Sequence, residues 1–268
     1  MPDAVTLGPL FVPMPRLMFV LAMVVTLLVS FLLERRYKVV GAAGLWLVLL
    51  AGFAVGRLFH VLENASVYAS SPIDILYVWQ GGFNWIAGVL VGLGVGVLWS
   101  RYRRQPYALY TGPVIAGALV WVIGSSLAGT SQVPDRPLPE LRVLNLEDEA
   151  YNLADLAGEP TVINLWASWC PPCRREMPVF ERAQDAWPDI HFVYANQGEN
   201  VATALAYLHE HDRNLQTVLV DSPSLLSQYY QARGLPTTLF YDAAGQLQAI
   251  HPGEISAVQL ANYLRDIQ

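Results

Sequence analysis

The two cysteines of this chain lie three residues apart, and they are the residues best suited to chemistry. They occur in the run Trp169-Cys170-Pro171-Pro172-Cys173, and the 268-residue sequence contains no other cysteine. Two thiols at this spacing can close a disulfide with each other and reopen it by exchange with another disulfide. The spacing predicts thiol–disulfide exchange at this pair, with no cofactor beyond the redox-active disulfide itself.

The cysteine pair follows a predicted strand and opens a predicted helix. The run 161–167 has the apolar, β-branched character of a buried strand, and Pro171 suits the first helical position, which needs no N–H donor. Free N–H groups and the helix dipole at that end stabilise a thiolate. We therefore predict Cys170 as the nucleophile and Cys173 as the more enclosed, resolving thiol, with Pro172 stiffening the turn.

Two other uses of the cysteines are open at this point. One is a static disulfide, although a bond that closes so short a loop removes little entropy from the unfolded chain. The other is half of a zinc site, for which His209 and His211 are the most suggestive further ligands. The placement of the pair at a strand-to-helix turn favours redox chemistry over both, so we expect no metal ion.

The rest of the C-terminal half alternates between strand-like and helix-like patterns. Four further apolar, β-branched runs predict strands, and two amphipathic stretches between them predict helices, which together indicate an α/β sandwich. The predicted strands are 190–195, 217–220, 237–241 and 247–250, and the predicted helices are 201–211 and 225–232.

Composition divides the chain in two. Residues 1–130 contain eight Lys and Arg against four Asp and Glu, whereas the remainder contains eight against eighteen. An acidic C-terminal half excludes nucleic acid as a partner, because phosphate binding needs clustered positive charge. With 54% hydrophobic residues overall, the N-terminal half is expected to lie in membrane lipid.

Four apolar stretches are long enough to cross a hydrocarbon core, which takes about 20 helical residues. A signal peptide at the first stretch would leave the other three unexplained, so we predict an α-helical membrane bundle of four transmembrane helices. The predicted spans are 17–33, 41–62, 83–99 and 108–128.

Basic residues collect in the first and third connections between the spans, and such loops stay in the cytoplasm. We therefore place the N-terminus and everything after the fourth span in the periplasm of a bacterial inner membrane. The basic residues are Arg35, Arg36 and Lys38 in the first connection, and Arg101, Arg103 and Arg104 in the third.

Three prolines within the segment 131–140 favour an extended connection. The predicted domains are thus 1–130 in the membrane, a linker at 131–140 and a redox domain at 141–268. In the third span, glycines 88, 92 and 96 favour close helix packing within the bundle over homodimerisation. Arg57 in the second span has three open roles, namely a polar functional site, snorkelling towards water and pairing with Glu63.

At the cysteines the chain resembles the thioredoxin superfamily, in its periplasmic TlpA/ResA/cytochrome c-maturation branch. The resemblance rests on W-A-S-W-C-P-P-C-R-R-E-M-P and on R-G-L-P-T-T some sixty residues later, and it covers residues 138–268. It implies a thioredoxin-like fold, a cis bond before Pro236 and a substrate surface at the active-site turn. That surface comprises Trp169, Pro171, Pro172, Leu235, Pro236 and Thr237.

Two polar residues distinguish this branch from ordinary thioredoxin. Asn164 stands where thioredoxin has a buried Asp, and Glu176 stands where the branch often places an acidic residue near the cysteines. Glu176 is expected either to shuttle the proton of Cys173 or to be a solvated helix residue.

The resemblance implies a reductase of disulfides in periplasmic proteins, recharged by a DsbD- or CcdA-like membrane electron donor. Because the predicted membrane module has no cysteine, it cannot relay electrons through thiols of its own. An oxidase that introduces disulfides is the alternative, and a redox-responsive docking module without turnover is another.

The membrane half is similar to the first part of prolipoprotein diacylglyceryl transferase, through Gly56-Arg57-Leu58 and the run 79–83. The characteristic His of that family aligns with Ile86, and its later spans have no counterpart. We therefore expect an anchor or docking surface in contact with membrane lipid rather than an acyl transferase.

Overall fold

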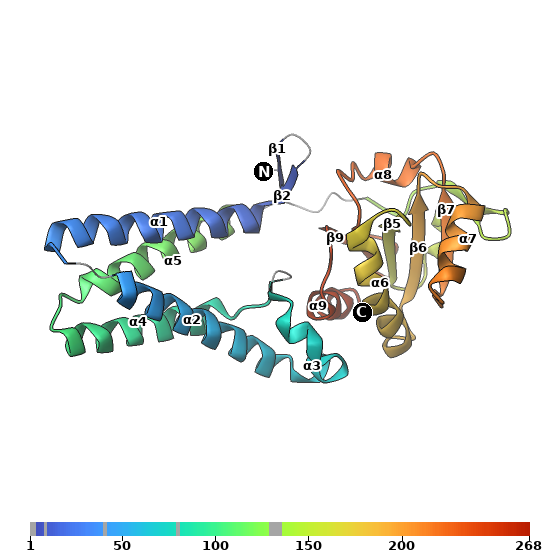
Figure 1. Ribbon diagram of the computed structural model, residues 1–268. Helices are drawn as coiled ribbons and strands as arrows, with labels where there is room; N and C mark the ends of the chain where they lie inside the picture. Colours follow the sequence, from blue (N-terminus) through green and yellow to red (C-terminus); the bar gives the residue numbers. More distant parts are fainter. Residues whose placement is uncertain (1–3, 8–9, 40–41, 79–80, 129–135) are drawn as a thin grey trace. The chain divides into compact units, whose positions relative to one another are not determined.

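Two separately packed units account for the change in composition along the chain. In the computed structural model these are Met1–Ser131 and Gln132–Gln268 (Figure 1). The structure describes residues 4–7, 10–39, 42–78, 81–128 and 136–268. Half of the predicted linker, residues 131–135, and residues 79–80 of the run that resembles the transferase lie outside the described residues.

In its described residues the first unit has four helices that are long and apolar enough to cross a membrane, which confirms the predicted bundle. A short hairpin of β1 (Ala4–Leu7) and β2 (Leu10–Pro13) precedes them, and α3 (Ala65–Ser70) and η1 (Pro72–Leu76) follow the second. The four helices are α1 (Met14–Tyr37), α2 (Ala42–Glu63), α4 (Trp85–Arg103) and α5 (Ala108–Ala128).

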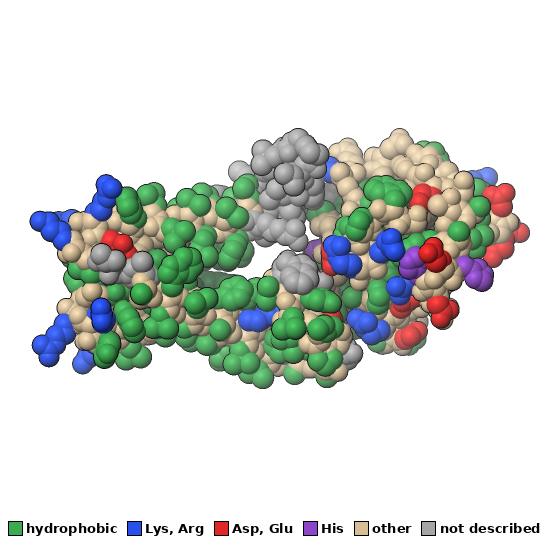
Figure 2. Space-filling view, viewed as in Figure 1, with side chains coloured by type: hydrophobic (Ala, Val, Ile, Leu, Met, Phe, Trp, Pro, Cys, Tyr) green, Lys and Arg blue, Asp and Glu red, His purple; other side chains and the backbone are tan. Residues whose placement is uncertain are grey.

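The outer surface of these helices suits lipid. Figure 2 shows hydrophobic side chains along the sides of the helices and basic side chains gathered at one end of the unit. Basic residues occupy the last turns of both α1 and α4, which end at the same side because successive antiparallel helices alternate in direction. This distribution is the one on which the predicted orientation rests.

Glycines bring α2 and α4 into close contact. A Cβ atom at Gly52 would lie 2.8 Å from the carbonyl oxygen of Gly88, and a Cβ at Gly88 would lie 2.9 Å from that of Gly52. Gly92 packs against Val48 of α2, and Gly96 against Tyr110 of α5. Among the described residues, the glycines of α4 thus serve packing within the bundle, as predicted.

Arg57 is buried and bound to backbone carbonyls of the connection between α2 and α4. Its Nη1 donates to Gly81 and Gly82 at 2.7 and 2.8 Å, and its Nε and Nη2 donate to Ile75 at 3.2 and 2.9 Å. Nη2 also donates to the Asp74 carbonyl. The Arg57 side chain therefore neither snorkels towards water nor pairs with Glu63. The hydrogen bonds from its guanidinium to these backbone carbonyls hold the connection in place.

The second unit is built on a seven-stranded sheet in the order β4-β3-β7-β6-β5-β8-β9. The central strands β5, β6 and β7 are parallel, and β8 pairs antiparallel with β5 (Figure 1). All five predicted strands are present, and β3 and β4 are additional. The strands are β3 (Arg142–Asn145), β4 (Ala150–Asn152), β5 (Thr161–Trp166), β6 (His191–Gln197), β7 (Thr217–Asp221), β8 (Thr237–Tyr241) and β9 (Leu247–Pro252).

Two apolar clusters cover the two faces of this sheet. Successive residues of β5 alternate between them, with Val162 and Trp166 in one and Ile163 and Leu165 in the other. The first cluster also contains residues of α6, α7 and α9, and the second contains residues of η3 and α8. The helices are η3 (Leu153–Leu156), α6 (Pro171–Ala186), α7 (Val201–Glu210), α8 (Leu225–Tyr229) and α9 (Ala257–Asp266).

The described end of the predicted linker is attached to the second unit. Leu138 is buried in its second apolar cluster, and the Leu138 N–H donates to the carbonyl of Gly245 at 3.0 Å. The Leu247 N–H in turn donates to the carbonyl of Arg136 at 3.2 Å. Residues 136–138 therefore pack with the redox domain instead of forming an independent spacer.

Candidate redox site

The cysteine pair lies at the N-terminus of α6, directly after β5. Cys170 is the N-cap residue, Pro171 begins the helix, and Cys170 and Cys173 are joined by a disulfide with their Cα atoms 5.3 Å apart. The Cys173 N–H donates to Cys170 Sγ at 3.3 Å, so the sulfur accepts one of the free N–H groups of the first helical turn. Cys170 is 2% exposed and Cys173 is fully buried.

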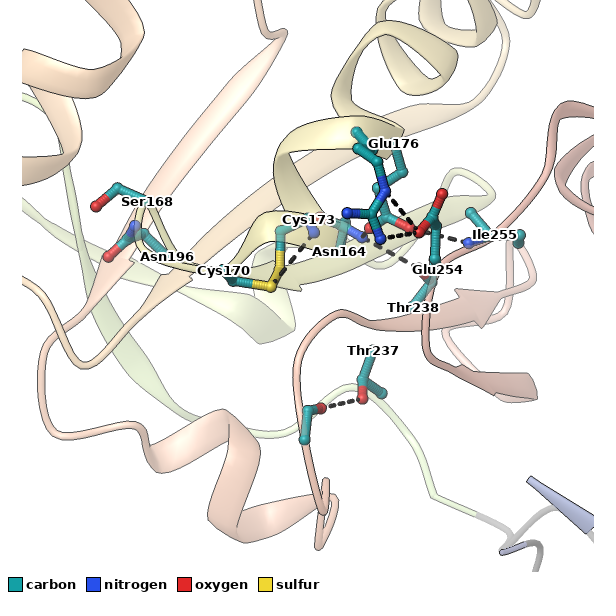
Figure 3. Close-up of a disulfide and its surroundings, with 12 residues drawn as sticks. Asn164, Ser168, Cys170, Cys173, Glu176, Asn196, Thr237, Thr238, Glu254 and Ile255 are labelled. Atoms are coloured by element: carbon teal, nitrogen blue, oxygen red, sulfur yellow. Dashed lines mark hydrogen bonds and ion pairs between the residues drawn. A yellow bond between two sulfur atoms is a disulfide. The ribbon is translucent and has the colours of Figure 1, made fainter. Parts of the chain in front are cut away.

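Glu176 lies one helical turn beyond Cys173, on the same face of α6 (Figure 3). Its side chain is 1% exposed, so the solvated alternative for this residue is wrong. Its Oε1 accepts from Asn164 Nδ2 at 2.8 Å, and its Oε2 accepts from the Ile255 N–H at 3.0 Å. Burial raises the pKa of Glu176 to about 8, against the smaller opposing effect of these two hydrogen bonds.

The period of β5 explains why Asn164 meets Glu176. Asn164 lies on the same face of the strand as Val162 and Trp166, and this is the face that α6 covers. Asn164 Nδ2 also donates to Thr238 Oγ1 of β8 at 3.1 Å. Asn164 Oδ1 is buried without a hydrogen-bond partner among the described residues, which leaves one acceptor near the carboxyl group of Glu176.

The segment that follows the cis peptide bond between Leu235 and Pro236 runs beside the turn that carries the cysteines. β8 begins at Thr237, which pairs with Leu165 near the end of β5, and Thr238 pairs with Asn164. Leu235 packs against the apolar cluster that contains both cysteines. The sheet register therefore brings the two sequence motifs together although they lie some sixty residues apart.

The predicted substrate-surface residues differ in exposure. Trp169, next to Cys170, is 66% exposed, and Pro171 is also exposed. Pro172 and Leu235 are partly buried, whereas Pro236 and Thr237 are buried, with Thr237 Oγ1 donating to the Gly234 carbonyl.

A carboxylate absent from the predicted site holds the active-site turn. Glu199, which follows β6, accepts from the Ser168 N–H at 2.8 Å and from Ser168 Oγ at 2.5 Å. It also accepts from Asn196 Nδ2 at 2.7 Å, and Figure 3 shows Ser168 and Asn196 together beside the cysteines. The spacing of Ser168 and Glu199 in the sequence does not predict this contact, because the contact depends on β5 and β6 being neighbours in the sheet.

The segment that leads into α9 supplies the other unpredicted part of the site. It provides the Ile255 N–H that binds Glu176, and Glu254, whose Oε2 lies 2.6 Å from Arg175 Nη2. A signal for this helix was present, since Ser256 and Gln259 form a capping box.

The histidines of the zinc alternative have other neighbours. His211 Nε2 lies 3.0 Å from Arg174 Nη2, and the His211 ring stacks on Tyr207. Across the described ranges, no three His, Cys, Asp or Glu side chains are grouped as metal ligands.

Each half of the chain is similar to a known protein family, in agreement with the resemblance found in its sequence. The model of the AhpC/TSA family matches residues 133–250, and that of prolipoprotein diacylglyceryl transferase matches residues 2–124. The thioredoxin-like protein YneN of Bacillus subtilis strain 168 is 28% identical over 191 residues, which are 68% of this chain and 96% of that protein. The crystal structure of StoA from Bacillus subtilis is 24% identical, with a TM-score of 0.41, and covers 48% of this chain and 99% of its own.

The thiol:disulfide interchange protein DsbE of Pseudomonas fluorescens biotype C is 30% identical over 129 residues, which are 48% of this chain and 71% of that protein. The cysteine pair at the start of α6 and strands β3 to β8 lie within residues 133–250, which the AhpC/TSA family model matches. The chain therefore belongs to the ResA/DsbE-type family of thioredoxin-fold thiol–disulfide oxidoreductases, and it carries this domain on a membrane unit that resembles part of prolipoprotein diacylglyceryl transferase.

Proposed function

We propose that this protein is a membrane-anchored reductase of disulfides in periplasmic proteins, and that its redox domain and N-terminus face the periplasm of a bacterial inner membrane. The observation that carries the proposal is the buried carboxyl of Glu176, one turn beyond a cysteine pair that caps α6. Such an arrangement provides a nucleophile, a resolving thiol and a proton acceptor on a single helix.

The reaction begins with Cys170 in its thiolate form, stabilised at the N-terminus of α6. The thiolate attacks one sulfur of the substrate disulfide, so a mixed disulfide forms and the first substrate thiolate leaves. Cys173 then loses its proton to the Glu176 carboxylate and attacks Cys170 Sγ. The internal disulfide closes, the second substrate thiolate leaves, and two electrons have passed from the cysteine pair to the substrate.

The reductive direction is supported by the charge around Cys173. A dithiol becomes more oxidising as its thiolates are stabilised, whereas a carboxylate beside a thiolate destabilises it. Glu176, buried on the same helix face as Cys173, has this effect when it is ionised. A DsbD- or CcdA-like membrane donor would reduce Cys170–Cys173 again by the reverse exchange.

The substrate chain is proposed to lie between the active-site turn and the segment before β8. Exposed Trp169 and Pro171 form one side, and Pro172 continues the surface into α6. On the other side lie the partly buried Leu235 and the backbone of the buried Pro236 and Thr237, because the pairing of Thr237 with Leu165 places this segment next to the turn.

Trapping provides the direct test. Full-length Cys173→Ala protein in cells should accumulate mixed disulfides with substrates and with the donor, and Cys170→Ala should accumulate none. Wild-type protein should be mostly reduced at steady state, and a mostly oxidised pool would assign the oxidase function instead. Absence of any mixed disulfide, together with no turnover of insulin, would leave only a docking role.

The orientation has a test of its own. Alkaline phosphatase fused after Gln268 is expected to be active, since it folds only outside the cytoplasm, and the same enzyme fused after Arg104 is expected to be inactive. The opposite pattern would place the redox domain in the cytoplasm.

A further inference from the structure

A groove rich in arginine lies directly beside the cysteine pair. It opens next to Pro171, the first residue of α6, between the first turns of that helix and the end of α7, and it has a volume of about 340 Å³. Residues 131–268 contain eight Arg and eighteen Asp and Glu, yet three of those eight arginines line this groove. The lining residues are Pro171, Arg174, Arg175, Tyr207, His211 and Arg213.

Arg174 is held over the groove without being neutralised. Its guanidinium carbon lies 5.7 Å from the ring centroid of Tyr207, on which His211 stacks at 4.4 Å. Because Arg only donates, His211 Nε2 must accept from Arg174 Nη2, and His211 Nδ1 then donates to the Tyr207 carbonyl at 3.0 Å. These contacts orient the guanidinium, and no carboxylate pairs with it among the described residues.

The two other arginines are each paired with one carboxylate that lies outside the set of lining residues. Arg175 binds Glu254 at 2.6 Å, and Arg213 binds Glu181 at 2.8 Å. Each guanidinium carries five N–H groups, so an ion pair with one carboxylate leaves some of these N–H groups unused. Arg213 Nε is one such donor, buried and without a partner among the described residues.

Tyr207 adds a further unused donor at this place. It lines the groove, is only 5% exposed, and its hydroxyl has no hydrogen-bond partner in the described part of the chain. The groove thus presents the positive charge of three arginines, and the two carboxylates that pair with Arg175 and Arg213 are already bound to them. Ligands with carboxylate oxygens complement such a surface, since guanidinium groups bind carboxylates in a bidentate manner.

We propose that this groove binds an acidic stretch of the polypeptide whose disulfide reacts with Cys170. The inference rests on the proposed function and names the substrate class that the same site selects. A segment lying over Pro171 reaches the groove within a few residues of its disulfide. The rest of the domain is acidic and repels such a segment, so the groove also determines the direction in which the substrate chain lies.

Three peptides of equal length test the proposal, each with one disulfide flanked by Glu, Gln or Lys residues. Their reduction by full-length protein in detergent is followed as a second-order rate constant at low and high salt. The wild-type protein should reduce the Glu peptide about tenfold faster than the Lys peptide at low salt, and the ratio should approach one at high salt.

Variants of Arg174 separate charge recognition from effects on the thiolate. Arg174→Gln should flatten the order of the three peptides, Arg174→Glu should invert it, and Arg174→Lys should preserve it. The control is Arg265→Gln on α9, whose guanidinium donates to Asn262 and which should leave all three rates unchanged. A uniform loss with all three peptides would mean that Arg174 acts on Cys170 itself, and it would overturn the proposal.

Two further outcomes are decisive. Equal rates for the three peptides would overturn the groove proposal while leaving the reductase function intact. Inhibition of the reduction of all three peptides by millimolar phosphate alone would have the same consequence. If no peptide is reduced, binding of Cys→Ser peptides by fluorescence anisotropy still tests the groove. Preferential binding of the Glu peptide would then support the groove and reject the proposed function, and absence of binding would reject both.

Discussion

Arg57 in the membrane unit and Glu176 in the redox domain are both buried ionisable side chains, but they differ in how completely hydrogen bonds satisfy them. Arg57 gives five hydrogen bonds to backbone carbonyls, and its guanidinium also lies 5.5 Å from the ring centroids of Tyr68 and Phe83. Within the described part of the chain Glu176 accepts two hydrogen bonds, and its pKa is raised to about 8.

This difference distinguishes a charged side chain that stabilises structure from an ionisable side chain that can exchange a proton during a reaction. A guanidinium keeps its proton in proteins, so Arg57 can be buried only with its donors fully satisfied. A carboxyl group can instead take up a proton, and burial raises the pKa of Glu176 to about 8 because its two hydrogen bonds offset only part of the lost solvation. The same full set of carbonyl contacts argues that Arg57 does not serve as a lipid headgroup site.

The largest effect is expected from Arg57→Leu. It leaves several buried carbonyls of the α2–α4 connection unpaired, which should destabilise the membrane unit by about 3–5 kcal/mol. Unfolding in detergent measures this loss, and reduction of a small disulfide by the redox domain should persist. Arg57→Lys should rescue little, because one ammonium cannot reach the same carbonyls. A fully stable Arg57→Leu protein would contradict the structural role.

Glu176→Gln should remove the proton acceptor of the second step. In the wild-type protein the rate at which Cys173 resolves a mixed disulfide should rise with pH through about 8, as Glu176 ionises. The variant should lose this titration and resolve about 100-fold more slowly at pH 8. Stopped-flow measurement of product release checks this, and an unchanged pH profile would exclude Glu176 from proton transfer.

Stability should also depend on Glu176. Its pKa in the folded state lies above the unfolded value, so the folded protein favours the protonated form. The oxidised wild-type protein should therefore lose stability relative to Glu176→Gln as the pH rises from about 5 to 8, by on the order of 3 kcal/mol. Chemical denaturation across this range measures the difference, and parallel curves would show that the carboxyl does not titrate there.

Asn164→Ala should sharpen the comparison by reducing the partners of Glu176 further. The hydrogen bond from Asn164 lowers the pKa of Glu176, so its loss should raise that pKa further and shift the rate profile to higher pH. Thr238→Val is the matched control, since it removes a partner of Asn164 that does not bind the carboxyl. Equal shifts in both variants would indicate a general disturbance of the strands.

The smallest effect is expected from Arg175→Gln, which breaks the ion pair with Glu254. The Arg175 side chain is 57% exposed, and such pairs contribute less than about 1 kcal/mol to stability. Denaturation at low and high salt measures this contribution. A loss well above this range would show that the pair positions Ile255 against Glu176.

Patterns local in the sequence determined the elements of this protein. Apolar runs of sufficient length predicted the four membrane helices, and β-branched runs predicted five strands, because periodicity reports directly which face of an element is buried. The strand-like run 161–167 and Pro171 placed the thiol pair at the start of a helix, and these are local signals too. The short strands β3 and β4 and helix α9 were not predicted. The capping box at Ser256 is a sequence signal that could have predicted α9.

Only the tertiary structure decided the environment of those elements. Glu176 is buried because β5 presents Asn164 and the segment before α9 presents Ile255, and these partners come from distant parts of the chain. The contacts of Arg57, the support of Ser168 by Glu199 and the cluster of arginines beside Pro171 arise in the same way. A residue type and its spacing thus predict what chemistry a side chain can perform, whereas its burial and charge depend on neighbours that only folding brings together.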